Sequence, residues 1–236
     1  SLFNVQSLTP VDNHVLVVGD IWIDHLLLAT AEPAHCEYLQ HSSAAGLALG
    51  LAGAELATTL VGFVGDDPLA AAIETVLLDA GVASDLLHIK AWPTFTSAHL
   101  EIVDARDAKL DAQGRRMRRH QDERALPIDG MSEYESHLQN RVERYLSNAG
   151  ALVLVDHGLG SIADPRALAY VAKQQGVPSV AVLGALASDE RYGDADQRLD
   201  LTQRDLAAGV RALQAALPLS HIHNSEPPRL LAISCA

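Results

Sequence analysis

The sequence is poor in cysteine and in basic residues, and each shortage argues against certain classes of protein. Two cysteines, Cys36 and Cys235, occur in 236 residues, and neither belongs to a Cys-x-x-Cys pair. This usage predicts reduced thiols in a reducing compartment, so we expect a cytoplasmic or organelle-matrix protein. Lysine and arginine number 17 against 30 acids, which gives a formal net charge of -13. Because nucleic-acid binding needs a basic face, we expect no nucleic-acid partner.

Long apolar runs are also missing from the sequence. No window reaches the ~18 consecutive apolar residues that cross a bilayer, so we expect no membrane insertion. The chain is nevertheless 48% hydrophobic, with only 4% aromatic residues, which is enough for a sizeable core in a globular protein. The eleven histidines are scattered, and the pair His35-Cys36 lacks the usual spacing of metal ligands. We therefore expect no metal site.

The first apolar run, residues 15–18, is too short for a helix and too apolar for a half-exposed strand. We interpret it as a strand buried on both faces, as in a parallel α/β sheet. Gly19 then allows a sharp turn, which leaves Asp20 and Asp24 at the carboxyl end of the strand, where such sheets bind ligands. Both are candidate substrate-binding residues. The alternative is that Asp20 caps the next element and Asp24 faces solvent.

Similar short strands alternate with helices along the chain. We expect strands at 60–65, 82–89, 94–103, 115–120, 151–156 and 177–183, and helices from 42 onward and at 69–80, 131–148, 165–175 and 204–217. This alternation predicts a parallel sheet with helices on both faces.

Three further site candidates come from this pattern. Asp156 ends a buried strand as Asp20 follows one, and Ser42-Ser43 begins a helix, where the pair acts either as a cap or as an anion site. Residues 25–41 are expected to be irregular. Residues 220–236 do not continue the pattern, and we expect an irregular tail there, either disordered or foreign to the protein.

Five stretches occur in an order that resembles the ribokinase-like (phosphofructokinase B) sugar kinases. They are VVGDIWID, the block 42–65, PTFTSAHLEI, ALVLVDHGLGSI and GVPSVAVL. Within that family the resemblance is closest to the heptose-7-phosphate kinase half of the bifunctional enzyme of ADP-heptose synthesis, and it covers residues 15–209.

The resemblance implies a three-layer, Rossmann-like α/β domain over residues 1–219, with a reduced β lid from segments of about 25–41 and 90–120. It implies a sugar bound over the strand ends and phosphoryl transfer from ATP with Mg²⁺. In this family, acids that match Asp20 and Asp24 hold sugar hydroxyls.

Several positions where the family carries functional groups differ in this chain. The family's Gly-Gly corresponds to Ser42-Ser43, and the Lys of its Asp-Tyr-x-Lys-Gly motif corresponds to Leu159. The Lys and Arg that hold a sugar phosphate in heptose kinases correspond to Ser97 and His99.

The nucleotide-binding motifs are weaker still. The Asn-x-x-Glu that organises Mg²⁺ and phosphate is matched by Thr202 to Asp205, so Thr202 and Asp205 are the candidate cofactor-binding residues. The Gly-Ala-Gly-Asp motif, which supplies the anion hole and the catalytic base, has no counterpart, and we expect the C-terminal part of the fold to be missing. We assign no catalytic residue, and Mg²⁺ and ATP are cofactors only if the chain is an active kinase.

Two functions follow from the resemblance. In the first, the protein has lost phosphotransfer and is a binding or structural subunit of a larger assembly, whose other subunits cover the edge and apolar face of a truncated sheet. In the alternative, it is an active ATP-dependent sugar or sugar-phosphate kinase seen as an incomplete chain. An unrelated Rossmann enzyme would show Gly-x-Gly-x-x-Gly after the first strand, and Gly19-Asp20-Ile21-Trp22 differs from that motif.

Overall fold

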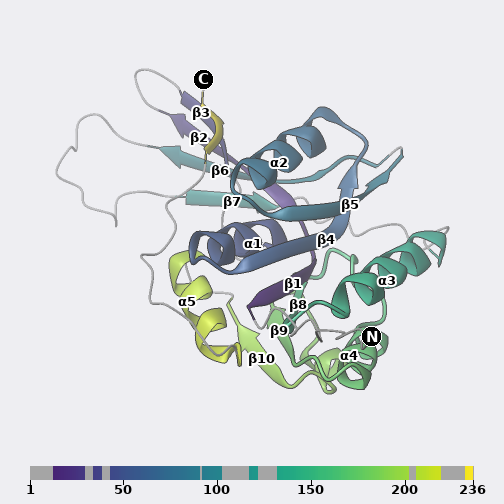
Figure 1. The fold of residues 1–236 in the computed structure, drawn as a ribbon. Coiled ribbons are helices and arrows are strands. Elements are labelled where there is room, and N and C mark those ends of the chain that lie inside the picture. Colours follow the sequence, from purple (N-terminus) through teal and green to yellow (C-terminus); the bar gives the residue numbers. More distant parts are fainter. Residues whose placement is uncertain are drawn as a thin grey trace, which may run out of the picture.

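Two β-sheets organise the fold, one enclosed by helices and one beside it (Figure 1). The computed structural model describes residues 13–29, 34–38, 43–90, 92–102, 117–121, 132–201, 206–218 and 232–235.

The larger sheet, which we call the core sheet, has six strands, all paired in parallel. Its order is β10-β9-β8-β1-β4-β5, so the first strand lies at the centre between β4 and β8. The strands are β1 His14–Gly19, β4 Ala57–Gly65, β5 Ala83–Ile89, β8 Ala151–Asp156, β9 Ser179–Leu183 and β10 Gln197–Asp200. The predicted parallel sheet is confirmed.

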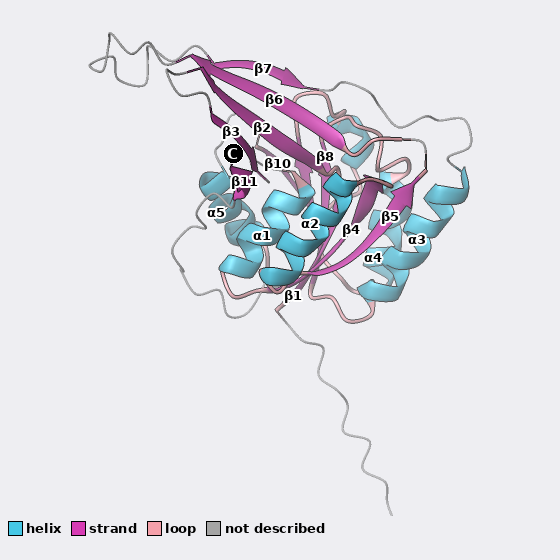
Figure 2. Ribbon diagram, turned by 90° about the horizontal axis from the view of Figure 1, so that it is seen from above, coloured by secondary structure: helices cyan, strands magenta, loops and turns pink. Residues whose placement is uncertain are grey.

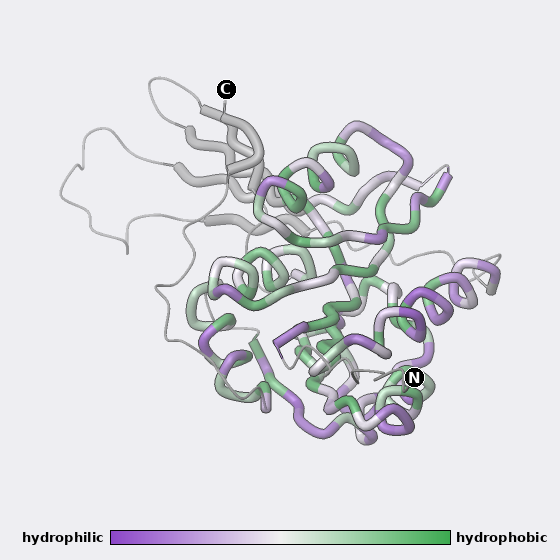
Figure 3. Tube along the Cα trace, viewed as in Figure 1, coloured by the Kyte–Doolittle hydropathy of each residue, from purple (hydrophilic) through white to green (hydrophobic). Residues whose placement is uncertain are grey.

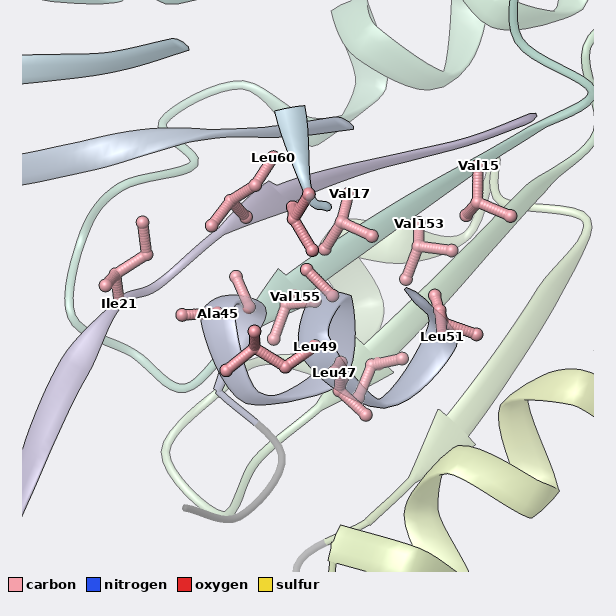
Figure 4. Packing of buried hydrophobic residues seen from close by; sticks show 14 of the residues in the cluster. Val15, Val17, Ile21, Ala45, Leu47, Leu49, Leu51, Leu60, Val153 and Val155 are labelled. Carbon is pink, nitrogen blue, oxygen red and sulfur yellow. The ribbon is translucent and has the colours of Figure 1, made fainter. Parts of the chain in front are cut away.

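Helices cover both faces of the core sheet because side chains on each strand alternate between them. Val15 and Val17 pack on the face covered by α1, α2 and α5, whereas Leu16 and Val18 pack on the face covered by α3 and α4 (Figure 4 shows the first face). The helices are α1 Ala44–Gly53, α2 Pro68–Asp79, α3 Ser132–Leu146, α4 Pro165–Gln174 and α5 Leu206–Ala216, with a short 3-10 helix, η1, at Asp189–Tyr192. This is the expected three-layer α/β fold.

The two helical layers differ in character. Every residue from Ala44 to Leu51 in α1 is buried, because this Ala-, Leu- and Gly-rich helix lies between the core sheet and α5. The outer sides of α3 and α4 are hydrophilic (Figure 3). None of the helices in the described ranges is both long and apolar enough to span a bilayer.

The second sheet has the order β11-β3-β2-β6-β7 (Figure 2). Its strands are β2 Trp22–Ala29, β3 Ala34–Tyr38, β6 Phe95–Ile102, β7 Met117–Gln121 and β11 Ala232–Cys235. β2 runs parallel to β6, and the other neighbouring pairs are antiparallel. Segments from both expected lid regions thus build one sheet.

Two expectations about this sheet need correction. Residues 25–41 were expected to be irregular, but they contain most of β2 and all of β3, because β2 pairs along its whole length with the distant strand β6. Within residues 220–236, also expected to be irregular, Ala232–Cys235 forms β11 against β3. The rest of that tail lies outside the described residues.

Two short passages carry the chain from the core sheet into the second sheet. Asp20 and Ile21 join β1 to β2, and residues 90–94 join β5 to β6. Each passage leaves the core sheet at the carboxyl end of a strand. The candidate site lies at this edge.

Candidate functional site

Asp20 and Asp156 lie side by side at the carboxyl edge of the core sheet, because the neighbouring strands β1 and β8 end there. Both are buried. Gly19 makes this approach possible: it has φ 147°, and a Cβ at this position would overlap the carbonyl oxygen of Val155. The Gly-Asp pair in the sequence therefore marks a close approach between the neighbouring strands β1 and β8.

The carboxylate of Asp20 is used entirely within the protein. Its oxygens accept hydrogen bonds from the backbone N–H groups of His157 at 2.7 Å, Leu159 at 3.2 Å and Ser161 at 3.3 Å. The Ser161 hydroxyl donates a fourth bond. A carboxylate has about four acceptor positions, so none is left over. We call Asp20 and residues 157–161 the inner acid clamp.

In the part of the chain that the structure describes, the groups that donate hydrogen bonds to Asp20 are backbone N–H groups and a hydroxyl, and none is a cation. Complete burial raises the pKa of Asp20, and the neighbouring charge of Asp156 raises it further, while the hydrogen bonds from Ser161 and His157 act in the opposite direction. Asp20 thus holds the loop after β8. A contact with a sugar hydroxyl, as predicted for this residue, would require the carboxylate to give up one of these bonds.

Asp156 is held from both sides. Its Oδ1 accepts a bond from the backbone N–H of Gly158 at 2.7 Å, and its Oδ2 accepts one from the hydroxyl of Tyr192 at 2.6 Å. The guanidinium of Arg191 lies 3.5 Å from the same Oδ2. Burial and the charge of Asp156 raise the pKa of Tyr192, so the phenol stays protonated and donates. A tyrosine and a cation from η1 therefore fix this acid.

The same loop is anchored to its surroundings at two more points. Arg191 donates to the carbonyl oxygens of Ile162 at 2.7 Å and Ala163 at 2.8 Å. Trp22 at the start of β2 packs edge-on against His157, with ring centroids 4.8 Å apart. The loop therefore connects the core sheet to the second sheet through an aromatic contact.

A second acid, Asp67, holds the other passage between the sheets. It caps α2 by accepting from the N–H of Ala70 at 3.0 Å, and it accepts from the N–H and the hydroxyl of Thr94, each at 2.7 Å. The Thr94 hydroxyl in turn accepts from the N–H of Gly65 at 2.9 Å. Since Thr94 directly precedes β6, we call Asp67 and Thr94 the outer acid clamp.

Asp67 is less buried than Asp20, and its charge is favoured. Burial alone would raise the pKa of Asp67, but the hydrogen bonds from Thr94, Ala70 and Leu69 outweigh it and lower the pKa. In the sequence, Asp67 is only an acid that precedes the helix expected at 69–80. Its bond to Thr94 was missed, because the two residues are 27 positions apart and no local pattern links them.

The remaining predicted site residues lie in different places. Ser43 is the N-cap of α1 and accepts from the N–H of Gly46 at 3.1 Å, so the capping alternative is confirmed. Asp24 was predicted at the end of the first strand. It lies instead within β2, opposite Tyr38 and Ser97 in the strand register, because the chain enters the second sheet directly after Ile21. Ser42, Thr202 and Asp205 lie outside the described residues.

The described residues do not fit a magnesium-nucleotide site. In the ranges that the structure describes, no three His, Cys, Asp or Glu side chains are placed to hold a metal ion. Asp20 has no acceptor position left, and Leu159, which stands where the kinases that the sequence resembles carry Lys, is buried.

Two relatives with the same name align with the chain. The Bifunctional protein HldE of Marinomonas sp. (strain MWYL1) is 31% identical over 187 residues, which cover 75% of this chain and 37% of that protein. Bifunctional protein HldE of Hahella chejuensis (strain KCTC 2396) is 26% identical over 178 residues, or 71% of this chain and 34% of that protein. The chain therefore spans little more than a third of the length of these relatives. No protein-family model matches it.

Solved structures share the fold at low sequence identity. A carbohydrate kinase from Agrobacterium tumefaciens superimposes with a TM-score of 0.58 at 14% identity, over 79% of this chain and 60% of that chain. The ribokinase of Arabidopsis thaliana, solved with ribose and ATP, superimposes with a TM-score of 0.54 at 16% identity, over 78% of this chain and 58% of that chain. The arrangement of strands and helices is thus that of ribokinase-like proteins.

Proposed function

We propose that this chain, which belongs to the ribokinase-like carbohydrate kinase family, binds a sugar or sugar phosphate without transferring a phosphoryl group and serves as a subunit of a larger assembly. The observation that carries the proposal is the state of the two acids at the carboxyl edge. Asp20 and Asp156 accept hydrogen bonds from the loop after β8 and from η1. They therefore stabilise the edge of the sheet as fixed structural groups.

The loss of transfer activity is supported by what surrounds these acids. Phosphoryl transfer depends on cations and backbone donors aimed at the transferred group. In the inner acid clamp the N–H groups of residues 157, 159 and 161 point at Asp20, so they are not available to an external phosphate. The buried Leu159 supplies no charge where kinases of the family carry Lys.

Sugar binding is supported by the second sheet, whose strand β2 carries Asp24 four positions after Asp20. Backbone pairing sets Asp24 in the middle of this sheet, between β3 and β6. Asp24 is thus the acid that we propose for the contact with a sugar hydroxyl, in place of Asp20.

The test is thermal unfolding of the chain with a panel of sugars and sugar phosphates, and with Mg-ATP and Mg-ADP. A ligand at a hundred times its dissociation constant adds about 2.7 kcal/mol to the stability. We expect a shift with one sugar or sugar phosphate, and we expect Asp24→Asn to abolish it. Asp164→Asn, which changes an exposed helix cap, is the matched control and keeps the shift.

A coupled assay for ADP release separates this proposal from its alternative, an active sugar kinase. The observation behind the alternative is that the chain spans 37% of the Marinomonas protein that it aligns with. Sugar-dependent ADP release above the rate of ATP hydrolysis alone would replace our proposal with the alternative. Light scattering tests the assembly, and a monodisperse monomer at micromolar concentration would refute that part.

A further inference from the structure

A hollow of about 530 Å³ lies along α4, on the side of the helix that faces the turn after η1. It is lined by the small residues Ala167, Ala169 and Gly193 and by the larger residues Arg166, Tyr170, Lys173 and Asp194. We call it the α4 groove. Its volume falls within the range of about 300–1,000 Å³ that is typical of small-molecule sites.

The lining of the α4 groove combines an aromatic ring with two cations. Tyr170 is 62% exposed and is one of three large hydrophobic residues exposed in the described ranges. Arg166 precedes it by four positions and Lys173 follows it by three, and these spacings place all three side chains on one face of the helix. An exposed ring between two cations can stack on a planar group while the cations bind an anion.

Among the described residues, Arg166 forms one long ion pair, with Asp194, and none is found for Lys173. Asp194, the acid that lines the α4 groove, lies 3.9 Å from Nε of Arg166, which is too far for a hydrogen bond. Both side chains of this pair are well exposed, at 72% and 63%. The positive charge is local, since the chain as a whole carries -13. An anionic ligand that binds here must therefore be small, so that its attraction to Arg166 and Lys173 exceeds its repulsion from the acidic surface of the protein.

We propose that the α4 groove binds a nucleoside monophosphate, with the base stacked on Tyr170 and the phosphate between Arg166 and Lys173. A phosphate monoester carries a charge of about -1.5 to -2, which two cations match. The proposal goes beyond the sugar site, because α4 runs from the loop after β8 away from the carboxyl edge, and Tyr170 and Lys173 lie in its second half.

The test is an NMR titration of the full chain with AMP, in which amide shifts locate the site. We expect shifts at residues 166–173 and 193–194, and we expect inorganic phosphate or adenosine alone to bind far more weakly than AMP. Shifts confined to the carboxyl edge of the core sheet would overturn the proposal. So would equal affinity for inorganic phosphate and AMP, or the absence of any shift at millimolar AMP.

Variants assign the two parts of the ligand. Tyr170→Ala should weaken AMP binding by about five- to hundredfold, the range for loss of a stacked base, while Tyr170→Phe should bind like the wild type. Arg166→Ala with Lys173→Ala should abolish the preference of AMP over adenosine. Arg211→Ala, an exposed cation on α5 across the core sheet, is the control. Unchanged AMP affinity in the Tyr170→Ala protein would refute the stacking geometry.

Thermal unfolding with sugars distinguishes the sugar-binding proposal from the α4-groove proposal. The α4-groove variants change residues outside the carboxyl edge, so the thermal shift with a sugar should be the same in Tyr170→Ala and in the wild type. If no sugar binds but AMP still shifts the α4 amides, the proposed function fails and the α4 groove stands.

Discussion

The inner and outer acid clamps do the same structural task at different depths. In each, one aspartate holds the passage of the chain from the core sheet into the second sheet. Asp20 is fully buried and bonds to a loop that begins 137 positions away. Asp67 is part-buried, and its partner Thr94 is 27 positions away.

The difference shows how depth decides what the same side chain does. Around Asp20, burial and a second acid outweigh the hydrogen bonds and raise the pKa, whereas around Asp67 the hydrogen bonds win and lower it. Asp20 is thus a group whose loss leaves buried donors unpaired, and Asp67 is a group that water can partly replace. This contrast makes the two clamps separable by experiment.

The largest expected effect is that of Asp20→Asn. The amide group of Asn presents a donor where the carboxylate accepts, so at least one buried N–H loses its partner and another faces a donor. We expect a loss of about 3–5 kcal/mol in the free energy of unfolding. Urea unfolding measures it, with Asp164→Asn as a control that should change stability by less than about 0.5 kcal/mol. A loss for Asp20→Asn as small as that of the control would contradict the stabilising role given to the inner acid clamp.

Tyr192→Phe tests the support of the inner clamp with a smaller change. It removes the hydroxyl that donates to Asp156 and keeps the ring in the core. A hydrogen bond to a charged group contributes about 1.5–3 kcal/mol, and we expect a loss in that range by urea unfolding. Tyr170→Phe removes an exposed hydroxyl from α4 and is the matched control, with little change expected. Equal effects for the two tyrosines would contradict the role given to Tyr192.

Thr94→Val breaks the outer clamp without changing the shape of the side chain. It removes the bond to Asp67 and the acceptor for the N–H of Gly65. We expect a loss of about 1–2 kcal/mol. We also expect faster hydrogen exchange at Gly65, while the amides of residues 157 and 159 keep their protection. Thr94→Ser restores the hydroxyl and should recover most of the loss. Exchange that speeds up equally at both clamps would show that they are not separate units.

The smallest effect is a dependence on pH with opposite sign at the two clamps. Asp67 has a lowered pKa in the folded state, so its contribution is present above the ordinary value of 3.8 and is lost as the pH falls through the folded pKa. Asp20 has a raised pKa, so the folded state holds its proton longer, and its contribution declines as the pH rises above 3.8.

The stability difference between wild type and each Asn variant, measured from neutral to acid pH, shows these trends directly. For Asp67→Asn the difference should shrink toward low pH, and for Asp20→Asn it should grow. Two curves with the same slope would contradict the opposite pKa directions.

The sequence predicts the parts of this protein that depend on neighbouring residues. The buried strand at residues 15–18 and the helix cap in the pair Ser42-Ser43 are both marked by local composition, and the structure confirms the strand and the cap at Ser43. The same reasoning brought Asp20 and Asp156 to one edge, because parallel strands end together.

What the sequence could not predict depends on partners far along the chain. Asp24 was expected beside Asp20, but pairing of β2 with β6 carries it into another sheet. Thr94 and Tyr192 are ordinary polar residues in the sequence, and their importance comes from Asp67 and Asp156, which only the fold brings near. For the same reason the use of Asp20 as a loop anchor could not be foreseen.

The central position of β1 in the core sheet has a consequence for folding during synthesis. β1 can pair with β4 once residues 57–65 are made, whereas the donors of the inner acid clamp lie 137 to 141 positions after Asp20. At about 5–20 residues per second, Asp20 waits roughly 7–28 s for the N–H groups that it will bind. During that time the side of β1 that pairs with β8, and the carboxylate of Asp20, have no partner, so we expect chaperones and proteases to act on the growing chain mostly before residue 161 is made.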